Sequence, residues 1–160
     1  MKVKQIVDED FVNYKKPSMF IITNTCSFKC DKENGTSICQ NSSLINEPDI
    51  EVKTSELVAR FLSNDISEAV VFGGLEPMDS FDDLIEFISL LRKASDCDVV
   101  IYTGYNVSEI EKKIIILRKF DNIIIKYGRY IPGQKSHLDP ILGVKLASSN
   151  QYAVKLEKIF

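Results

Sequence analysis

Short, wholly apolar segments alternate with amphipathic segments along this chain, and this alternation constrains the fold more than any other feature. The apolar segments are residues 69–72, 99–102 and 123–125, all of strand length. Strands buried on both faces have no polar positions, as is typical of parallel sheets. We therefore expect three neighbouring strands of a parallel sheet, with an earlier strand at residues 19–22.

Three segments between these strands carry apolar residues at helical spacing. The first covers residues 54–63, and Thr54 is its expected N-cap. Ser80 begins a second predicted helix and Ser108 a third, each followed three residues later by an acidic residue, as in a capping box. Helices alternating with apolar strands predict an α/β fold, with a mostly parallel sheet covered by helices.

The stretch from 128 to 151 has no regular pattern, apart from Leu146, which is expected in a last short strand. The 160 residues, of which 44% are hydrophobic, fit a single domain over residues 1–160 with a real core. A net charge of -3 argues against nucleic acid as the main partner. No apolar run approaches the roughly 18 residues of a membrane span, and the N-terminus lacks a signal-peptide core. We expect a cytoplasmic protein with reduced thiols and no membrane partner.

Three of the four cysteines lie close together after the predicted strand at 19–22. Cys26, Cys30 and Cys39 have the spacing Cys-x3-Cys-x8-Cys, which differs from the two close pairs of most zinc sites. Three thiolates can hold a metal centre and leave one coordination position open for chemistry. Cys97 stands apart at the start of a strand and is expected to be a small buried hydrophobe.

The cysteine pattern alone leaves several interpretations open. A cysteine-ligated iron–sulfur site is one, and a structural zinc site is another. Zinc would need a fourth ligand, and the one histidine, His137, is expected in a surface loop. A redox disulfide and a chance cluster of reduced thiols are the remaining alternatives.

Several chemistry-bearing segments follow predicted strands directly. They are the cysteine loop, Gly73-Gly74, Thr103-Gly104 and the stretch after Ile125. Because ligands of parallel α/β sheets lie beyond the carboxyl ends of the strands, we expect these segments to converge on one edge.

The turn Gly73-Gly74-Leu75-Glu76-Pro77 has two interpretations. The two glycines can serve only a tight turn. Alternatively, their bare backbone lets a ligand approach, and Glu76 accepts a hydrogen bond from a cationic group. Taken by itself, Lys126 fits a solvated lysine at a strand end.

Taken in order, these motifs resemble those of radical S-adenosylmethionine enzymes, in particular the activating proteins of anaerobic (class III) ribonucleotide reductases. The resemblance covers roughly residues 19–151. It differs from the family pattern, Cys-x3-Cys-x2-Cys with an aromatic residue just before the third cysteine. In this chain eight residues separate Cys30 from Cys39, and Ile38 takes the place of the aromatic residue. The resemblance is carried by the cysteine loop, the Gly73-Gly74-Leu75-Glu76-Pro77 turn, Tyr102-Thr103-Gly104-Tyr105, Lys126-Tyr127-Gly128-Arg129-Tyr130 and Leu146-Ala147-Ser148-Ser149-Asn150-Gln151.

The resemblance implies a partial, open β/α barrel and two cofactors. Cys26, Cys30 and Cys39 would hold a [4Fe-4S] cluster, whose fourth iron takes the amino and carboxylate groups of S-adenosylmethionine. One electron from the cluster then gives methionine and a 5′-deoxyadenosyl radical. No further catalytic side chain is implied. The implied cofactor-binding residues are Ile38, Gly73, Gly74, Glu76, Thr103 and Lys126.

The implied reaction is removal of a hydrogen atom from a glycine of the large anaerobic ribonucleotide reductase subunit. The implied electron donor is a reduced flavodoxin- or ferredoxin-type protein. Arg129, Tyr130 and residues 149–151 are expected to border the cleft that the partner enters. Two alternatives remain: a non-catalytic iron–sulfur or zinc-binding module that docks on a partner, and a radical enzyme acting on another glycyl-radical protein or peptide.

Overall fold

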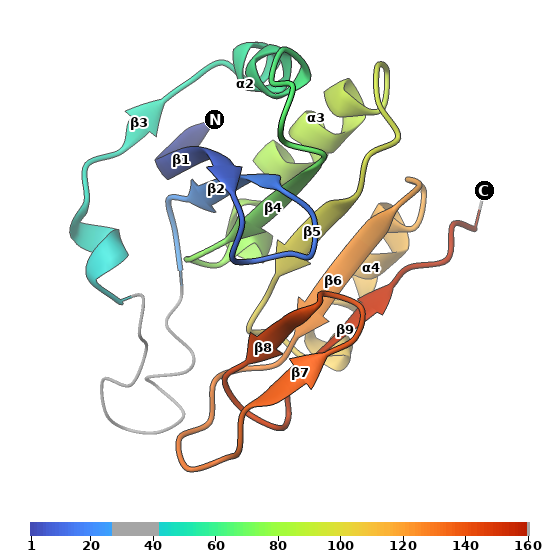
Figure 1. The fold of residues 1–160 in the computed structure, drawn as a ribbon. Helices are drawn as coiled ribbons and strands as arrows, with labels where there is room; N and C mark the ends of the chain where they lie inside the picture. The colour runs from blue at the N-terminus through green and yellow to red at the C-terminus, as the bar shows by residue number, and fades with distance from the viewer. Residues whose placement is uncertain (27–41, 160) are drawn as a thin grey trace.

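A seven-stranded sheet forms the centre of the computed structural model, which describes residues 1–26 and 42–159 (Figure 1). Its strand order is β3-β1-β2-β4-β5-β6-β9, and β7 and β8 form a separate hairpin. The strands are β1 (Lys2–Asp10), β2 (Ser18–Thr23), β3 (Ile50–Glu51), β4 (Ala69–Gly73), β5 (Val99–Tyr102), β6 (Ile123–Tyr127), β7 (His137–Asp139), β8 (Val144–Leu146) and β9 (Tyr152–Lys155). The helices are η1 (Ser42–Asn46), α2 (Thr54–Leu62), η2 (Pro77–Ser80), α3 (Phe81–Leu91), η3 (Val107–Glu109) and α4 (Glu111–Leu117).

The four central strands run parallel, which confirms the predicted α/β class and the predicted strands. β2 pairs with β4, β4 with β5, and β5 with β6, all parallel. The edges differ, because β1, β3 and β9 pair antiparallel with their neighbours. The sheet is open and ends at β3 and β9. The strands β1 and β9 are partly exposed and carry charged residues, so they lack the apolar signal of the central strands.

The three predicted helices form, but two of their predicted starts are wrong. Lys53 is the N-cap of α2, and Thr54 lies inside the helix, where its hydroxyl donates to Glu86 at 3.2 Å. Ser108 does not open the third helix. Ser108 lies instead inside a 3-10 turn, η3, which begins at Val107 after Asn106, whose backbone N–H donates to the carboxylate of Glu109 at 2.8 Å.

The start of α3 was predicted correctly, since Ser80 is its N-cap, although no side-chain capping bond forms. The Ser80 hydroxyl lies 3.1 Å from that of Thr25, in the segment leading to the cysteines. This helix N-terminus is therefore tied to the start of the cysteine segment.

The helices α2, α3 and α4 cover one face of the sheet (Figure 1). Phe72 from β4 meets Phe87 from α3 edge-on, with ring centroids 5.2 Å apart. Burial of so many apolar side chains supplies most of the stabilisation of such a layer. The main fully buried members are Met19, Ile21, Leu57, Phe72, Leu84, Phe87, Ile88, Ile101 and Ile123.

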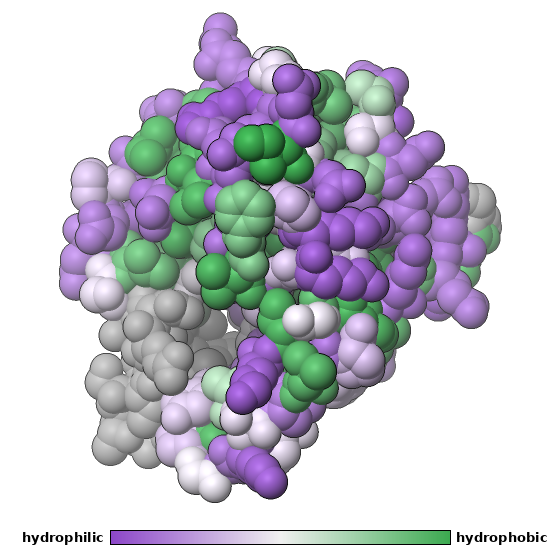
Figure 2. Space-filling view, viewed as in Figure 1, coloured by the Kyte–Doolittle hydropathy of each residue, from purple (hydrophilic) through white to green (hydrophobic). Residues whose placement is uncertain are grey.

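The opposite face of the sheet is covered by a connecting segment and a hairpin rather than by helices. The β1–β2 connection and the β7–β8 hairpin lie over it, and Tyr14, Leu142 and Leu146 form a second apolar cluster with the sheet. The backbone N–H of Lys15 donates to the carbonyl of Leu142 at 2.8 Å and joins the two covering segments. On this side, hydrophobic side chains show at the surface among hydrophilic ones (Figure 2).

The hairpin corrects the expectation that residues 128–151 are irregular. Leu146 does lie in a strand, but that strand is β8, and the last strand is β9. His137 lies in β7 and is half-buried rather than exposed on a loop. Within the described residues, no helix combines the length and apolar character needed to cross a bilayer.

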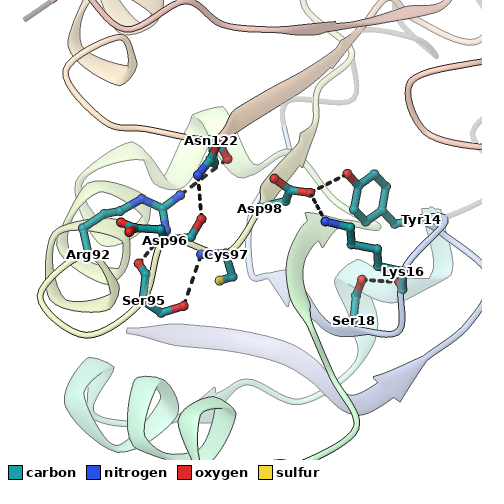
Figure 3. A network of polar contacts seen from close by, with 9 residues as sticks. All are labelled: Tyr14, Lys16, Ser18, Arg92, Ser95, Asp96, Cys97, Asp98 and Asn122. Atoms are coloured by element: carbon teal, nitrogen blue, oxygen red, sulfur yellow. Dashed lines mark hydrogen bonds and ion pairs between the residues drawn. The ribbon is translucent and has the colours of Figure 1, made fainter.

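A polar network holds the amino ends of the central strands (Figure 3). Asp98, just before β5, accepts hydrogen bonds from the Tyr14 hydroxyl at 2.8 Å and from the Lys16 ammonium at 3.0 Å. Burial alone would raise the pKa of Asp98, but these two donors outweigh it and leave the pKa below its ordinary value. Cys97, beside Asp98, is partly buried and packs against the helix-side core.

Replacing Tyr14 with Phe removes one of the two donors to Asp98. We expect the free energy of unfolding to fall by about 1–2 kcal/mol at pH 7. Because the pKa of Asp98 is lowered on folding, the stabilisation is complete above the unfolded pKa of about 4 and fades as the pH falls further. Urea unfolding at pH 7 and pH 3 measures both effects. A loss that is the same at both pH values, or equal to that of the control Tyr152→Phe, would contradict this assignment.

Candidate functional site

A cavity of about 270 Å³ lies at the carboxyl edge of the parallel strands. Cys26 lies just beyond the end of β2, Gly74 follows β4, Thr103 follows β5 and Lys126 lies near the end of β6. All four line the cavity, together with Glu76. The expected convergence of these segments is therefore observed.

Some predicted site residues do not line the cavity, and others fall outside the described residues. Gly73 does not line the cavity and packs inside the sheet edge instead. Cys30, Ile38 and Cys39 fall outside the described residues. Their predicted roles as cluster ligands and cofactor contact stay predictions.

The carboxylate of Glu76 joins the segments that form the cavity. Its Oε1 accepts hydrogen bonds from the Thr103 hydroxyl at 2.8 Å and the Met78 backbone at 3.0 Å. Its Oε2 accepts from the Gly104 backbone at 2.8 Å. The backbone N–H of Glu76 donates to the carbonyl of Thr25 at 3.1 Å. One residue thus connects the ends of β2, β4 and β5.

Glu76 is only 7% exposed, and this burial raises its pKa above the ordinary value, while the three donors oppose that rise. A carboxylate can accept about four hydrogen bonds, two on each oxygen. Among the described residues Oε2 accepts one. It therefore keeps the capacity to accept one more donor from the cavity, such as an ammonium group.

The Gly-Gly turn is required by the packing of the protein itself. Gly74 has a φ of +79°, and a Cβ there would lie 2.9 Å from two side-chain carbons of Ile22. A Cβ on Gly73 would lie 3.1 Å from the ring of Phe20. This contact with β2 gives the turn a structural role, and because Gly74 also lines the cavity, the approach of a ligand to its bare backbone stays a prediction.

Two cationic side chains that lie in and just after β6, those of Lys126 and Arg129, also line the cavity. Lys126 is 6% exposed; its ammonium donates to the Gly128 carbonyl at 3.0 Å and lies 5.8 Å from the centre of the Tyr102 ring. Arg129 is also 6% exposed and donates to Glu109 at 2.6 Å. Lys126 is therefore a buried residue of the cavity, which excludes the interpretation of a solvated lysine.

Arg129 lines the cavity whose opening it was expected to border, but its side chain is buried in the wall, and its contact with a partner stays a prediction. Its guanidinium is held between the Glu109 carboxylate and the Tyr105 ring, whose centre is 5.8 Å away. Arg129, Tyr130 and Gln151 line the cavity, whereas residues 149 and 150 do not. Arg129 is buried in the cavity wall, whereas Tyr130 is half-buried.

The turn at residues 148–151 serves as a hydrogen-bonded brace. The Gln151 side chain accepts from the Ser148 backbone at 3.1 Å and donates to the Gly128 carbonyl at 3.2 Å. The Asn150 side chain donates to the Arg129 carbonyl at 2.8 Å. The brace holds the segment that follows β6.

Sequence reasoning missed several residues of the cavity. Lys145, Leu146 and Ala147 come from the hairpin and its exit, and Gly128 follows β6 with a φ of +101°. A glycine directly after an apolar strand was the available signal for Gly128. Nothing in the local sequence indicated that the hairpin would fold back to this edge.

Cys26 is half-buried and lines the cavity. Among residues 1–26 and 42–159 no three histidine, cysteine or acidic side chains are grouped to hold a metal ion. Of the three clustered cysteines, Cys26 lies within the described residues, and ligation by Cys30 and Cys39 stays a prediction.

The model of the family described as "4Fe-4S single cluster domain" matches residues 17–153. The match runs from just before β2 into β9, so it contains the cavity and all three clustered cysteines. No curated protein and no solved structure matches the chain.

Replacing Gly74 with Ala tests the packing of the turn, and Gly133→Ala is a matched control. Gly133 has a similar φ of +82° but no neighbour within 4 Å of an added Cβ. The control should cost only the left-handed backbone penalty, about 1–2 kcal/mol. Gly74→Ala should cost a further 1–3 kcal/mol or so, because Ile22 must move. Equal losses in urea unfolding would show that Ile22 adapts freely.

Proposed function

The chain belongs to the 4Fe-4S single cluster domain family, and on this premise we propose that it is a radical S-adenosylmethionine activating enzyme. The observation that carries the proposal is the meeting of Cys26 with Gly74, Glu76, Thr103 and Lys126 in one cavity. In this proposal a metal ligand (Cys26), an acceptor for an amine (Glu76) and a group that binds a carboxylate (Lys126) line the same cavity. The order of the motifs along the chain supports the same proposal.

In this proposal Cys26, Cys30 and Cys39 bind the cluster. When bound, a [4Fe-4S] cluster supplies the electron that divides S-adenosylmethionine into methionine and a 5′-deoxyadenosyl radical. The described residues bind and orient the S-adenosylmethionine. Glu76 Oε2 has room to accept from the ligand ammonium, and Lys126 provides a buried positive charge for the carboxylate.

The remaining wall residues shape the cavity and shield it from water. Thr103 is buried, and its hydroxyl donates a hydrogen bond to the Glu76 carboxylate. Its contribution is therefore to hold that carboxylate in place. Leu75 and Leu146 are buried beside it and make part of the wall apolar. A low-dielectric wall strengthens the charge interactions made inside it.

We further propose that the radical acts on a glycine of a large anaerobic ribonucleotide reductase, with a flavodoxin- or ferredoxin-type protein as electron donor. The resemblance of the motifs supports this choice of substrate. The open sheet, which ends at β3 and β9, fits a protein substrate whose loop enters the cavity.

Anaerobic reconstitution with iron and sulfide tests the cofactor proposal. The wild-type chain should bind about four irons, with absorption near roughly 400 nm typical of such clusters. Cys26→Ala, Cys30→Ala and Cys39→Ala should each lose this absorption, and Cys97→Ala, whose residue packs on the helix-side core, should keep it. Loss in Cys97→Ala with retention in Cys39→Ala would contradict the ligand assignment.

Activity separates an enzyme from a non-catalytic module. With dithionite and S-adenosylmethionine, the reconstituted chain should release 5′-deoxyadenosine, measured by chromatography. With the reductase present, electron paramagnetic resonance should detect a glycyl radical. Zinc in place of iron, or an intact cluster that yields no 5′-deoxyadenosine, would contradict the proposal. Release of 5′-deoxyadenosine with no radical on the reductase would redirect it to another protein or peptide.

A further inference from the structure

The hairpin of β7 and β8 has an exposed face that is continuous with the cavity. Leu138 and Lys145 lie directly opposite each other across the two strands, so their side chains are on the same side of the hairpin. Leu138 is 64% exposed, and Lys145 is exposed as well. Lys145 also lines the cavity, whereas Leu138 does not. We call this pair the outer face of the hairpin, and it begins where the cavity wall ends.

The outer face is basic as well as apolar. Residues 131–147 contain two exposed lysines, Lys135 and Lys145, and one acidic residue, Asp139. Asp139 is only 4% exposed, so it does not balance the lysines at the surface. Within residues 1–26 and 42–159, no acidic side chain pairs with Lys145. In a chain whose net charge is -3, this face is therefore complementary to an acidic surface that also carries an apolar residue.

The buried Asp139 carboxylate holds the hairpin against the sheet. Its Oδ1 accepts from the Leu142 backbone at 2.9 Å, and its Oδ2 accepts from the backbone of Ala153 in β9 at 3.0 Å. Leu142 and Leu146 anchor the inner side of the hairpin in the second apolar cluster. Over the hairpin, hydrophobic side chains lie beside hydrophilic ones at the surface (Figure 2). A face that is already held in position loses less conformational entropy when a partner binds.

We propose that the outer face of the hairpin is the docking surface for the protein substrate, and that it binds an acidic segment carrying an apolar residue. The proposal rests on the proposed function and adds to it the place where the substrate binds. A substrate segment that reaches into the cavity lies beside the residues that line it, and Lys145 is one of these. A carboxylate of that segment pairs with Lys145, and its apolar residue covers Leu138. An electron donor has no need to enter the cavity.

Charge reversal at Lys145 tests the electrostatic part of the surface. Binding of the reconstituted chain to the large anaerobic reductase subunit is measured by anaerobic biolayer interferometry. Lys145→Glu should weaken binding about tenfold or more, and the loss should shrink at high salt, which screens exposed charges. Lys145→Arg should keep the affinity. Lys135→Glu is the matched control, because Lys135 is exposed in the same segment but does not line the cavity, and it should have little effect.

Removal of the exposed leucine tests the apolar part. Leu138→Ser should weaken binding to the reductase about fivefold, because a covered apolar side chain is lost. It should lower the glycyl-radical yield at subsaturating reductase. Release of 5′-deoxyadenosine without the reductase should be unchanged, since Leu138 does not line the cavity. The matched control is Ile115→Ser on α4, whose residue is 54% exposed on the helix side of the sheet, and it should leave both readouts unchanged.

The outcomes separate this surface from the proposed function. Wild-type affinity in Lys145→Glu and Leu138→Ser, with radical formation on the reductase intact, would overturn the docking surface alone. A wild-type chain that releases 5′-deoxyadenosine but does not bind the reductase would overturn the proposed substrate, and the docking surface with it.

Two further results would assign the outer face to another occupant and overturn the proposal. The first is a loss, in Leu138→Ser, of 5′-deoxyadenosine release driven by reduced flavodoxin, with reductase binding unchanged. The second is self-association of the wild-type chain in sedimentation that Leu138→Ser abolishes, again with reductase binding unchanged. The first would indicate the electron donor, and the second would indicate another copy of this chain.

Discussion

The hydrogen bonds to the Glu76 carboxylate are the interaction on which the site depends. Parallel strands deliver their carboxyl ends to one edge, but each end continues into a separate loop. Glu76 accepts from the residues after β5 and from its own turn, and its backbone reaches the segment after β2. A buried carboxylate without such donors would be costly, so the loops and the carboxylate stabilise each other.

The charges of the cavity follow from the same arrangement. Glu76 follows β4, and Lys126 and Arg129 lie in and after β6, two strands further along the sheet. This separation gives the cavity an acidic side and a basic side. Arg129 forms an ion pair with Glu109, and Lys126 donates to the Gly128 carbonyl beside the Tyr102 ring. Such a layout suits a ligand with an ammonium at one end and a carboxylate at the other.

The central part of the fold could be predicted from the sequence, because residues 69–72, 99–102 and 123–125 are apolar throughout and their partners are adjacent in order. The convergence of Gly74, Thr103 and Lys126 followed from that topology. The β7–β8 hairpin and the burial of Arg129 could not be predicted, since both depend on long-range contacts with Tyr14 and Glu109. The start of α4 was missed because the Asn106–Glu109 bond competes with the Ser108 pattern.

The central claim is that one cavity holds both a [4Fe-4S] cluster and an amino-acid ligand. Electron–nuclear double resonance on the reduced, reconstituted protein tests it directly, with S-adenosylmethionine carrying ¹⁵N in its amino group. The account predicts a ¹⁵N coupling to the cluster in the wild-type chain. A cluster signal that shows no ¹⁵N coupling, although the ligand is bound, would contradict it.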